Sequence, residues 1–195
     1  LMIGNDLQLT AIPVGSLETN CYVLGLKGRD DAVVVDPGDE GEKILSVLDG
    51  RKPAAVLLTH GHFDHTGALS FFAGVPIYIH ELDSIMLGDS HYSFGRIAGD
   101  HARRPDATGF LQEGQILRLA GMDIHVLHTP GHTRGSVCFR VNDELLTGDT
   151  LFKGDYGRTD LPGGSPEQMR ASLRRLLRLS GCHVLPGHGP DDWIK

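Results

Sequence analysis

Four metal-binding side chains crowd into six consecutive positions of this chain. Directly after the apolar run of residues 54–58, the sequence reads Thr59-His60-Gly61-His62-Phe63-Asp64-His65. Because His60 and His62 are two positions apart, an extended chain places both imidazoles on one side. A turn after them directs Asp64 and His65 toward the same space. Burying four such groups without a cation is unfavourable, so the segment predicts a metal site at the end of a strand.

Three further apolar runs each stop at a glycine beside one metal-binding side chain. These points are Thr129-Pro130-Gly131-His132, Thr147-Gly148-Asp149 and Pro186-Gly187-His188-Gly189. Glycine permits close backbone approach and unusual dihedral angles. Each point alone is typical of a plain turn. A fourfold recurrence in one chain argues against four unrelated turns.

The rest of the chain is typical of short strands bounded by glycine, proline and aspartate. In the first half we expect strands at residues 7–14, 21–26, 32–35, 54–59 and 76–80. In the second half we expect them at residues 115–119, 122–128, 136–141 and 144–147. The stretch 88–109 has no clean period and is expected to be a loop or loop–helix insertion, a kind of segment that often serves as a lid.

Three helices are expected among these strands. Residues 42–48 have helical apolar spacing, with Asp39 as the expected cap, and residues 67–73 form a short apolar segment. The third helix starts at Ser165, which forms a capping box with Gln168 and precedes a proline at the first helical position. Gly181 is expected to end it, after an apolar stripe made of Met169, Leu173, Leu176 and Leu177. The spacing by itself indicates a mixed α/β protein.

Composition excludes several classes of protein. A length of 195 residues suits one domain, and no apolar run approaches the roughly 18 residues that a membrane span needs. The formal charge of −7 argues against a broad nucleic-acid footprint. Three widely spaced cysteines form neither a disulfide framework nor a CxxC pair. With no signal-peptide pattern at residues 1–6, we expect a cytoplasmic protein.

The HxHxDH pattern followed by a distant histidine, an aspartate and a last histidine resembles the metallo-β-lactamase-fold hydrolases. The resemblance runs from Asp36-Pro37-Gly38 to His188. Within that superfamily, Thr19-Asn20-Cys21-Tyr22, residues 148–152 and Gly157-Arg158 are similar to the glyoxalase II group, in its short form without a C-terminal helical domain. The resemblance implies a single domain over residues 1–195, folded as a four-layer αββα sandwich with two mixed β-sheets and helices on the outer faces.

The resemblance also implies a role for each candidate ligand. One metal ion would be held by His60, His62 and His132, and a second by Asp64, His65 and His188, with Asp149 bridging the pair. Asp36 would orient these ligands from behind. The implied cofactors are two divalent cations, zinc in the first place and iron or manganese as alternatives. The superfamily's β-lactamases carry cysteine where this chain has Asp149, which argues against antibiotic hydrolysis.

Such a site favours hydrolysis of a small-molecule thioester. Two cations that share a water make it hydroxide near neutral pH, and Asp64 would orient it for attack on the carbonyl. A thiol with a pKa of about 8.5 leaves as thiolate without a strong acid. The expected reaction resembles the hydrolysis of S-lactoylglutathione by glyoxalase II.

Alternatives stay open at this point. Persulfide dioxygenases share the fold and most ligand residues but use a single iron, and Gly157-Arg158-Thr159-Asp160 resembles their sequence equally well. A nuclease is disfavoured by the charge and the short length, and a non-catalytic metal-binding module by the complete ligand set. The Arg158 side chain either pairs with a substrate carboxylate or caps a loop carbonyl.

Overall fold

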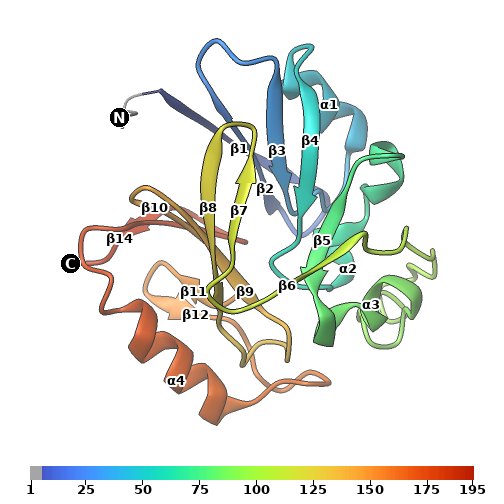
Figure 1. The fold of residues 1–195 in the computed structure, drawn as a ribbon. Coiled ribbons are helices and arrows are strands. Elements are labelled where there is room, and N and C mark those ends of the chain that lie inside the picture. Colours follow the sequence, from blue (N-terminus) through green and yellow to red (C-terminus); the bar gives the residue numbers. More distant parts are fainter. Residues whose placement is uncertain (1–5) are drawn as a thin grey trace.

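Two six-stranded sheets form the centre of the computed structural model, which describes residues 6–195 (Figure 1). The first sheet has the order β1-β2-β3-β4-β5-β6. Its first three strands are antiparallel neighbours, whereas β3 to β6 run parallel. The strands are β1 (Leu7–Val14), β2 (Thr19–Leu26), β3 (Asp31–Val35), β4 (Lys52–Leu57), β5 (Ile77–His80) and β6 (Gly109–Leu111). The expectation about the start of the chain falls mostly on residues 1–5, outside the described residues.

The second sheet has the order β14-β13-β10-β9-β8-β7. The pair β10–β13 is parallel and the other pairs are antiparallel, so both sheets are mixed, as the resemblance implied. Its strands are β7 (Ile116–Leu119), β8 (Met122–His128), β9 (Val137–Val141), β10 (Glu144–Gly148), β13 (His183–Pro186) and β14 (Asp192–Trp193). A small hairpin, β11 (Leu151–Phe152) and β12 (Asp155–Tyr156), lies beside it.

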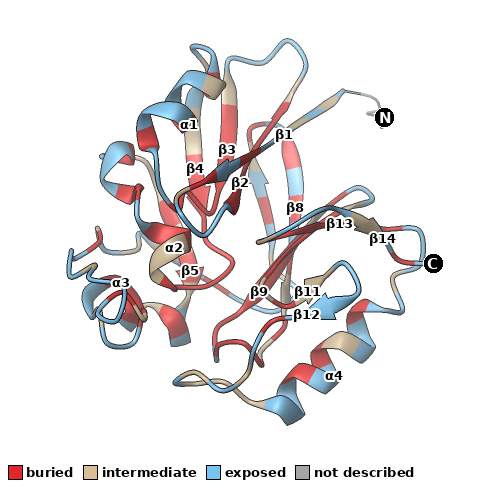
Figure 2. Cartoon of the chain, turned by 180° about the vertical axis from the view of Figure 1, so that it is seen from behind, coloured by how far each residue is buried: buried red, intermediate tan, exposed pale blue. Residues whose placement is uncertain are grey.

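Three apolar cores separate four layers. Along β2, Cys21 and Val23 face the first outer core, while Tyr22 and Leu24 face the central core between the sheets. This alternation follows from the two-residue period of a strand. The first outer core also holds Ile44 of helix α1 (Gly41–Leu48), and the third core joins Leu176 of helix α4 (Pro166–Leu176) to the second sheet. The buried bands of both sheets and the exposed outer faces of α1 and α4 are visible in Figure 2.

The expected cap of α1 is wrong. Glu40, not Asp39, occupies the capping position, with φ 48° and no capping bond from its side chain. The carboxylate of Asp39 instead accepts a hydrogen bond from the backbone N–H of Glu40 at 2.6 Å. Because the chain enters the helix through a left-handed residue, Asp39 lies one position too early to cap it.

The expected helix over residues 67–73 is replaced by shorter elements. Helix α2 (Phe63–Thr66) is followed by the 3₁₀ turn η1 (Leu69–Phe72), and further along lie η2 (Glu81–Asp83) and helix α3 (Ile85–Gly88). The interruption has a local cause: the N–H of Ala68 donates to the carbonyl of Pro37 at 3.0 Å and not to a helical neighbour. The loop after β3 thus competes with helix continuation.

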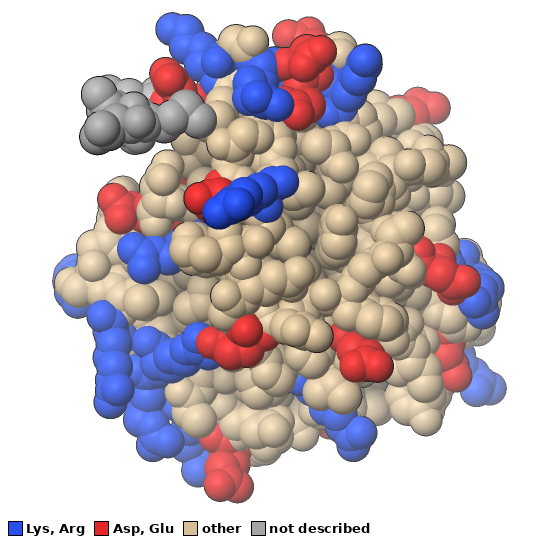
Figure 3. Space-filling view, viewed as in Figure 1, with Lys and Arg blue, Asp and Glu red and all other residues tan. Residues whose placement is uncertain are grey.

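Helix α4 begins as expected and ends early. Ser165 Oγ accepts from the N–H of Gln168 at 3.3 Å, with Pro166 in the first turn. The predicted end at Gly181 is wrong, because the α-helix ends at Leu176 and the N–H groups of Arg178 and Leu179 donate to carbonyls only three residues back. Figure 3 shows basic side chains gathered over α4, whose exposed face carries Arg170, Arg174 and Arg175, with the exposed Arg178 just after the helix.

Residues 89–108 contain turns and bends without a helix or strand. The buried side chain of Arg104 ties this segment to α2, since it donates to Thr66 Oγ1 at 3.3 Å and to the carbonyl of Phe63 at 3.4 Å. It also pairs with Asp100. That this stretch is an insertion into a single domain stays a prediction. Within residues 6–195, no helix has the length and apolar character to cross a membrane.

Candidate metal centre

The seven candidate ligands come from four chain segments, each of which follows a strand. His60 and His62 lie between β4 and α2, and Asp64 and His65 lie within α2. The other three follow β8, β10 and β13, and they are His132, Asp149 and His188. The structure brings all seven together, although they span both sheets.

Three histidines form a buried group, which we call the inner trio: His60, His62 and His132. Their ligand atoms all lie within 4.8 Å of one another. The Nδ1 atom of His62 is 2.9 Å from the Nε2 atom of His132. No member is more than 4% exposed. Three imidazole nitrogens that converge in this way can hold one cation.

A second group, the outer trio, consists of Asp64, His65 and His188. The Nε2 atom of His188 lies 3.2 Å from Asp64 Oδ2 and 3.3 Å from His65 Nε2. His65 is fully buried, whereas the side chain of His188 is 28% exposed. The outer trio therefore faces solvent on one side.

Asp149 lies between the two trios. Its Oδ2 atom is 3.4 Å from His132 Nε2 of the inner trio and 3.5 Å from His188 Nε2 of the outer trio. Its Oδ1 atom is 3.3 Å from His65 Nε2. One carboxylate thus reaches both groups, which is the geometry that a bridging ligand requires.

Unpartnered buried atoms show that the centre fits cations. Within the described part of the chain, His60 Nε2, His62 Nε2 and Asp149 Oδ1 are buried without a hydrogen-bond partner. Leaving such an atom unsatisfied costs about 1–3 kcal/mol, and a cation removes that penalty. Imidazole and carboxylate donors suit zinc and iron alike. The clusters fit a dinuclear metal site, and the assignment of each ligand to a metal stays a prediction.

The pKa values of the candidate ligands are shifted in different directions. Burial lowers the pKa of His60 well below its ordinary value and the pKa of His62 to about 3, so both rings are neutral with lone pairs available. Burial alone raises the pKa of Asp149, but the neighbouring His65 outweighs it and holds that pKa well below its ordinary value. For His188 burial lowers the pKa, yet hydrogen bonding to Asp149 outweighs burial and raises it to about 9.

Asp36 supports the ligands from behind. Its carboxylate accepts from His65 Nδ1 at 2.9 Å and from the hydroxyl of Thr59 at 2.6 Å, and the N–H of Thr59 donates to it at 2.8 Å. A histidine that donates from Nδ1 presents the lone pair of Nε2 to a metal. Asp36 has φ 52°, so the Asp36-Pro37-Gly38 turn holds it in a strained backbone conformation. Thr59 was not predicted as a supporting residue, although it directly precedes His60.

The segment Thr19–Tyr22 of β2 holds the loop that carries His188. The side-chain amide of Asn20 donates to the carbonyls of Pro186 and Gly189 at 3.0 and 2.9 Å, and Tyr22 OH donates to the Pro186 carbonyl at 2.6 Å. In addition, Thr19 Oγ1 donates to Asp64 Oδ2 at 3.0 Å. This segment therefore links the first sheet to the outer trio. In the sequence it was noted only because it is similar to the glyoxalase II group.

Gly187 lies where no side chain fits. A Cβ atom there would lie 2.3 Å from Asp149 Oδ1 and 2.8 Å from His65 Cε1. Because real Cβ contacts are not that short, only glycine allows the backbone to pass this close to the ligands.

Arg158 contributes a backbone atom to the centre. Its carbonyl accepts from His132 Nδ1 at 2.8 Å. Its exposed guanidinium is paired with Asp160 through two hydrogen bonds of 2.7 Å each. A contact between this side chain and a substrate stays a prediction.

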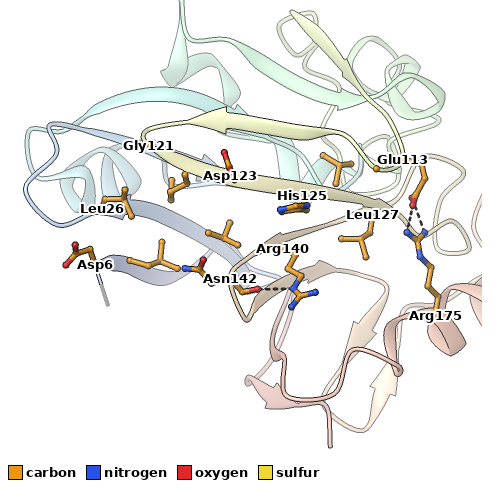
Figure 4. A pocket seen from close by; sticks show the side chains of 15 residues that line it. Asp6, Leu26, Glu113, Gly121, Asp123, His125, Leu127, Arg140, Asn142 and Arg175 are labelled. Carbon is orange, nitrogen blue, oxygen red and sulfur yellow. Dashed lines mark hydrogen bonds and ion pairs between the residues drawn. The ribbon is translucent and has the colours of Figure 1, made fainter. Parts of the chain in front are cut away.

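Two hollows differ in their relation to the centre. One, of about 350 Å³, adjoins Asp64 and is lined by Leu17, Phe63 and Ala98 among others. The other, of about 860 Å³, lies along β8 and β9 and is lined by outward-facing side chains such as His125 and Arg140 (Figure 4). None of the seven candidate ligands lines it. Of these two, the smaller hollow is therefore the one that adjoins the centre.

Sequence relatives cover almost the whole chain. It is 46% identical to a protein of Mycobacterium leprae described as uncharacterized protein ML0493, over 95% of this chain and 93% of the relative. It is 36% identical to a Haemophilus influenzae protein named hydroxyacylglutathione hydrolase GloC, over 94% of this chain and 91% of the relative.

Two solved structures also match almost the whole chain. The BLEG-1 B3 metallo-beta-lactamase has a TM-score of 0.90 at 34% identity, covering 96% of this chain and 94% of that one. TTHA1623, crystallised in a di-iron-bound form, has a TM-score of 0.83 at 38% identity, covering 95% and 94%. These matches confirm the four-layer fold. The model of the metallo-beta-lactamase superfamily matches residues 14–188, and this chain therefore belongs to that superfamily.

Proposed function

We propose that this protein is a metal-dependent hydrolase of small-molecule thioesters. In this proposal the inner trio, the outer trio and Asp149 hold two divalent cations, zinc in the first place. The observation that carries it is the convergence of the two trios on Asp149, with three buried ligand atoms unpartnered among the described residues.

Side chains of the outer trio and of Thr19 are placed to orient the attacking water at the solvent-facing side of the centre. A pair of divalent cations there supplies an activated water near neutral pH and stabilises negative charge on a carbonyl oxygen. Thr19 and His188 both contact Oδ2 of Asp64, which fixes this carboxylate. Asp64 is placed to accept a hydrogen bond from the attacking water and so to direct it toward the carbonyl.

The leaving group distinguishes thioesters from other carbonyl compounds. Carboxylates that face cations stay ionised, so neither Asp64 nor Asp149 can donate a proton to a departing group. A thiol with a pKa of about 8.5 departs as thiolate and needs no such donor, whereas an amine or alkoxide does.

The surroundings and the relatives support the same substrate class. The hollow beside Asp64, about 350 Å³ in volume, is large enough for a small acyl group. The GloC relative is named for hydrolysis of a hydroxyacylglutathione, which is a thioester. The di-iron form of TTHA1623 makes iron the alternative to zinc.

Metal analysis combined with a substrate panel tests the proposal. The protein is purified without added metal and its zinc, iron and manganese contents are measured. Hydrolysis of lactoylglutathione, an acyl-coenzyme A and a simple thioester is then followed by thiol release. We expect two metal ions per chain and thioester turnover that a chelator abolishes. Asp123→Asn, a change on the exposed face of β8, serves as the matched control and should behave as wild type.

Two other activities are decided in the same panel. A β-lactam is included because BLEG-1 is described as a B3 metallo-beta-lactamase. Glutathione persulfide with an oxygen electrode tests dioxygenase activity. One iron per chain with persulfide-dependent oxygen uptake, or β-lactam turnover that exceeds thioester turnover, would overturn the thioesterase proposal. Equal rates on all thioesters would remove only the likeness to glyoxalase II.

A further inference from the structure

A buried carboxylate behind the inner trio has no part in the proposed function. Asp83 ends the 3₁₀ turn η2, is 0% exposed, and belongs to none of the clusters that could hold a metal. Its position 18 residues after His65 gave it no place in any motif. Buried carboxylates are rare unless their hydrogen bonds are satisfied, so its partners indicate why it is there.

All three hydrogen bonds of the Asp83 carboxylate go to loops that carry inner-trio histidines. Oδ2 accepts from the backbone N–H of Gly61 at 3.2 Å and from the hydroxyl of Thr133 at 2.7 Å. Oδ1 accepts from the backbone N–H of Gly135 at 2.7 Å. Gly61 lies between His60 and His62, and Thr133 directly follows the third histidine. One side chain thus joins a loop of the first sheet to a loop of the second.

The two loops approach Asp83 as closely as sterics allow. A Cβ atom on Gly135 would lie 2.7 Å from the Asp83 carboxylate, and one on Gly61 would lie 3.0 Å from the Asp83 backbone carbonyl oxygen. A small displacement of Asp83 would therefore move both loops. The rings that these loops carry meet tightly, with His62 and His132 centroids 4.7 Å apart.

The outer trio is held by different contacts. Asp36 accepts from His65, and the Thr19–Tyr22 segment holds Asp64 and the His188 loop. Asp83 makes none of its hydrogen bonds to these groups. Asp83 therefore contacts only loops of the inner trio, whereas Asp36 holds His65 of the outer trio directly and reaches His60 only through the Thr59 hydroxyl, which lies 3.0 Å from His60 Nδ1.

We propose that Asp83 is a positioning residue for the inner trio, setting the metal affinity of the site formed by His60, His62 and His132 and leaving the outer site unchanged. This inference rests on the proposed metal centre. Groups that orient metal ligands typically contribute about 10- to 100-fold to affinity, and we expect a loss in that range when the Asp83 carboxylate is replaced.

Asp83→Asn is the sharpest variant because it preserves shape. Asparagine offers one acceptor oxygen and one NH₂ donor, so at least one N–H or O–H of the two loops then faces a donor. Metal-free wild type and variant are titrated with Zn²⁺ against a chelator, and with Co²⁺ for its ligand-field absorption. We expect one site to weaken by about 10- to 100-fold and the other to keep its wild-type affinity.

A second pair of variants covers a failure of Asp83→Asn to fold. Thr133→Val removes one hydrogen bond to Asp83 with little change in volume, and Thr133→Ser restores the hydroxyl. We expect Val to weaken the same single site and Ser to recover wild-type binding. A merely structural role predicts a lower melting temperature without selective loss of one metal.

The outcomes separate this inference from the proposed function. If wild type binds two metals and hydrolyses thioesters but Asp83→Asn or Thr133→Val binds both metals as wild type does, the role of Asp83 is refuted alone. An equal weakening of both sites also refutes it. If wild type binds no metal pair, the proposed centre fails and this inference falls with it.

Discussion

The two trios of the centre use similar donors in opposite environments. The inner trio consists only of histidines, is almost fully buried, and joins a loop of each sheet. The outer trio includes a carboxylate, and its His188 ring is partly open to solvent. Burial lowers the pKa of His62 to about 3, while hydrogen bonding to Asp149 and Asp64 outweighs burial and raises that of His188 to about 9.

The difference assigns distinct tasks to the two sites. A buried trio of imidazoles provides a rigid anchor for one cation, because its geometry is fixed by packing and by hydrogen bonds from both sheets. The trio with an exposed side is the one beside the hollow next to Asp64. We therefore expect substrate to meet the outer site, while the inner site contributes mainly charge and position.

Replacing the residue shared by both trios should have the largest effect. Asp149→Ala removes the carboxylate that approaches His132 of one trio and both histidines of the other. We expect loss of both metals and hydrolysis reduced to background, measured by metal analysis and thiol release. Retention of two metals with unchanged turnover would contradict the assignment of Asp149 to the metal centre.

A methyl group at Gly187 should displace two of the candidate ligands, Asp149 and His65. The Cβ of Gly187→Ala would meet Asp149 Oδ1 at 2.3 Å and His65 Cε1 at 2.8 Å. Overpacking of this kind costs about 1–3 kcal/mol, and we expect the outer site to lose metal before the inner one. The check is Zn²⁺ titration with unfolding of the same metal-free protein. Gly189→Ala is an informative comparison, since φ there is 78° but no atom lies within 4 Å of a Cβ. Wild-type metal binding in Gly187→Ala would show that the site tolerates a shift of this loop.

A change at Asp36 should divide the two trios. In Asp36→Asn the new NH₂ group can take the place of the oxygen that accepts from His65 Nδ1. The ring then changes tautomer, and Nε2 carries a proton where a metal needs a lone pair. We expect about a 10- to 100-fold loss of affinity at the outer site and a smaller change at the inner one, the reverse of Asp83→Asn. Titration of both variants side by side decides whether the trios are separable.

The local parts of the centre could be predicted from the sequence, as could the layers of the fold. His60, His62, Asp64 and His65 lie within six consecutive positions, so their convergence follows from the extended spacing of the two histidines and the turn that comes after them. His132, Asp149 and His188 were found because each follows an apolar run beside glycine. The central strands were predicted because each is a short apolar run. Strand β2 is apolar along its length because its alternate side chains are buried in two different cores, one on each face of the sheet.

The supporting contacts could not be predicted, because they depend on packing between distant segments. Asp83 reaches Gly61 and Thr133, which are 22 and 50 positions away, and no local period marks such a residue. The end of α4 was misjudged for a related reason: the apolar Leu177 continues the helical stripe in the sequence, but its side chain is 56% exposed and the helix ends at Leu176. Tertiary burial overrides local propensity at such points.

The smallest expected effect sets the baseline for any pH comparison of the trios. Outside the centre, His183 packs on Trp193 and hydrogen bonds to Glu144 at 2.7 Å and Asp191 at 2.6 Å. Burial lowers its pKa, but hydrogen bonds to Asp191 and Glu144 outweigh burial and raise it. A raised folded pKa contributes stability that is fully present below the unfolded value of about 6.5 and lost as pH rises through the folded value. His183→Gln should therefore lower the free energy of unfolding of the metal-free protein more at about pH 6 than at about pH 9, as measured by urea denaturation. An equal loss at both pH values would show that His183 contributes packing and not charge, and metal release by the two trios could then be compared across pH without this correction.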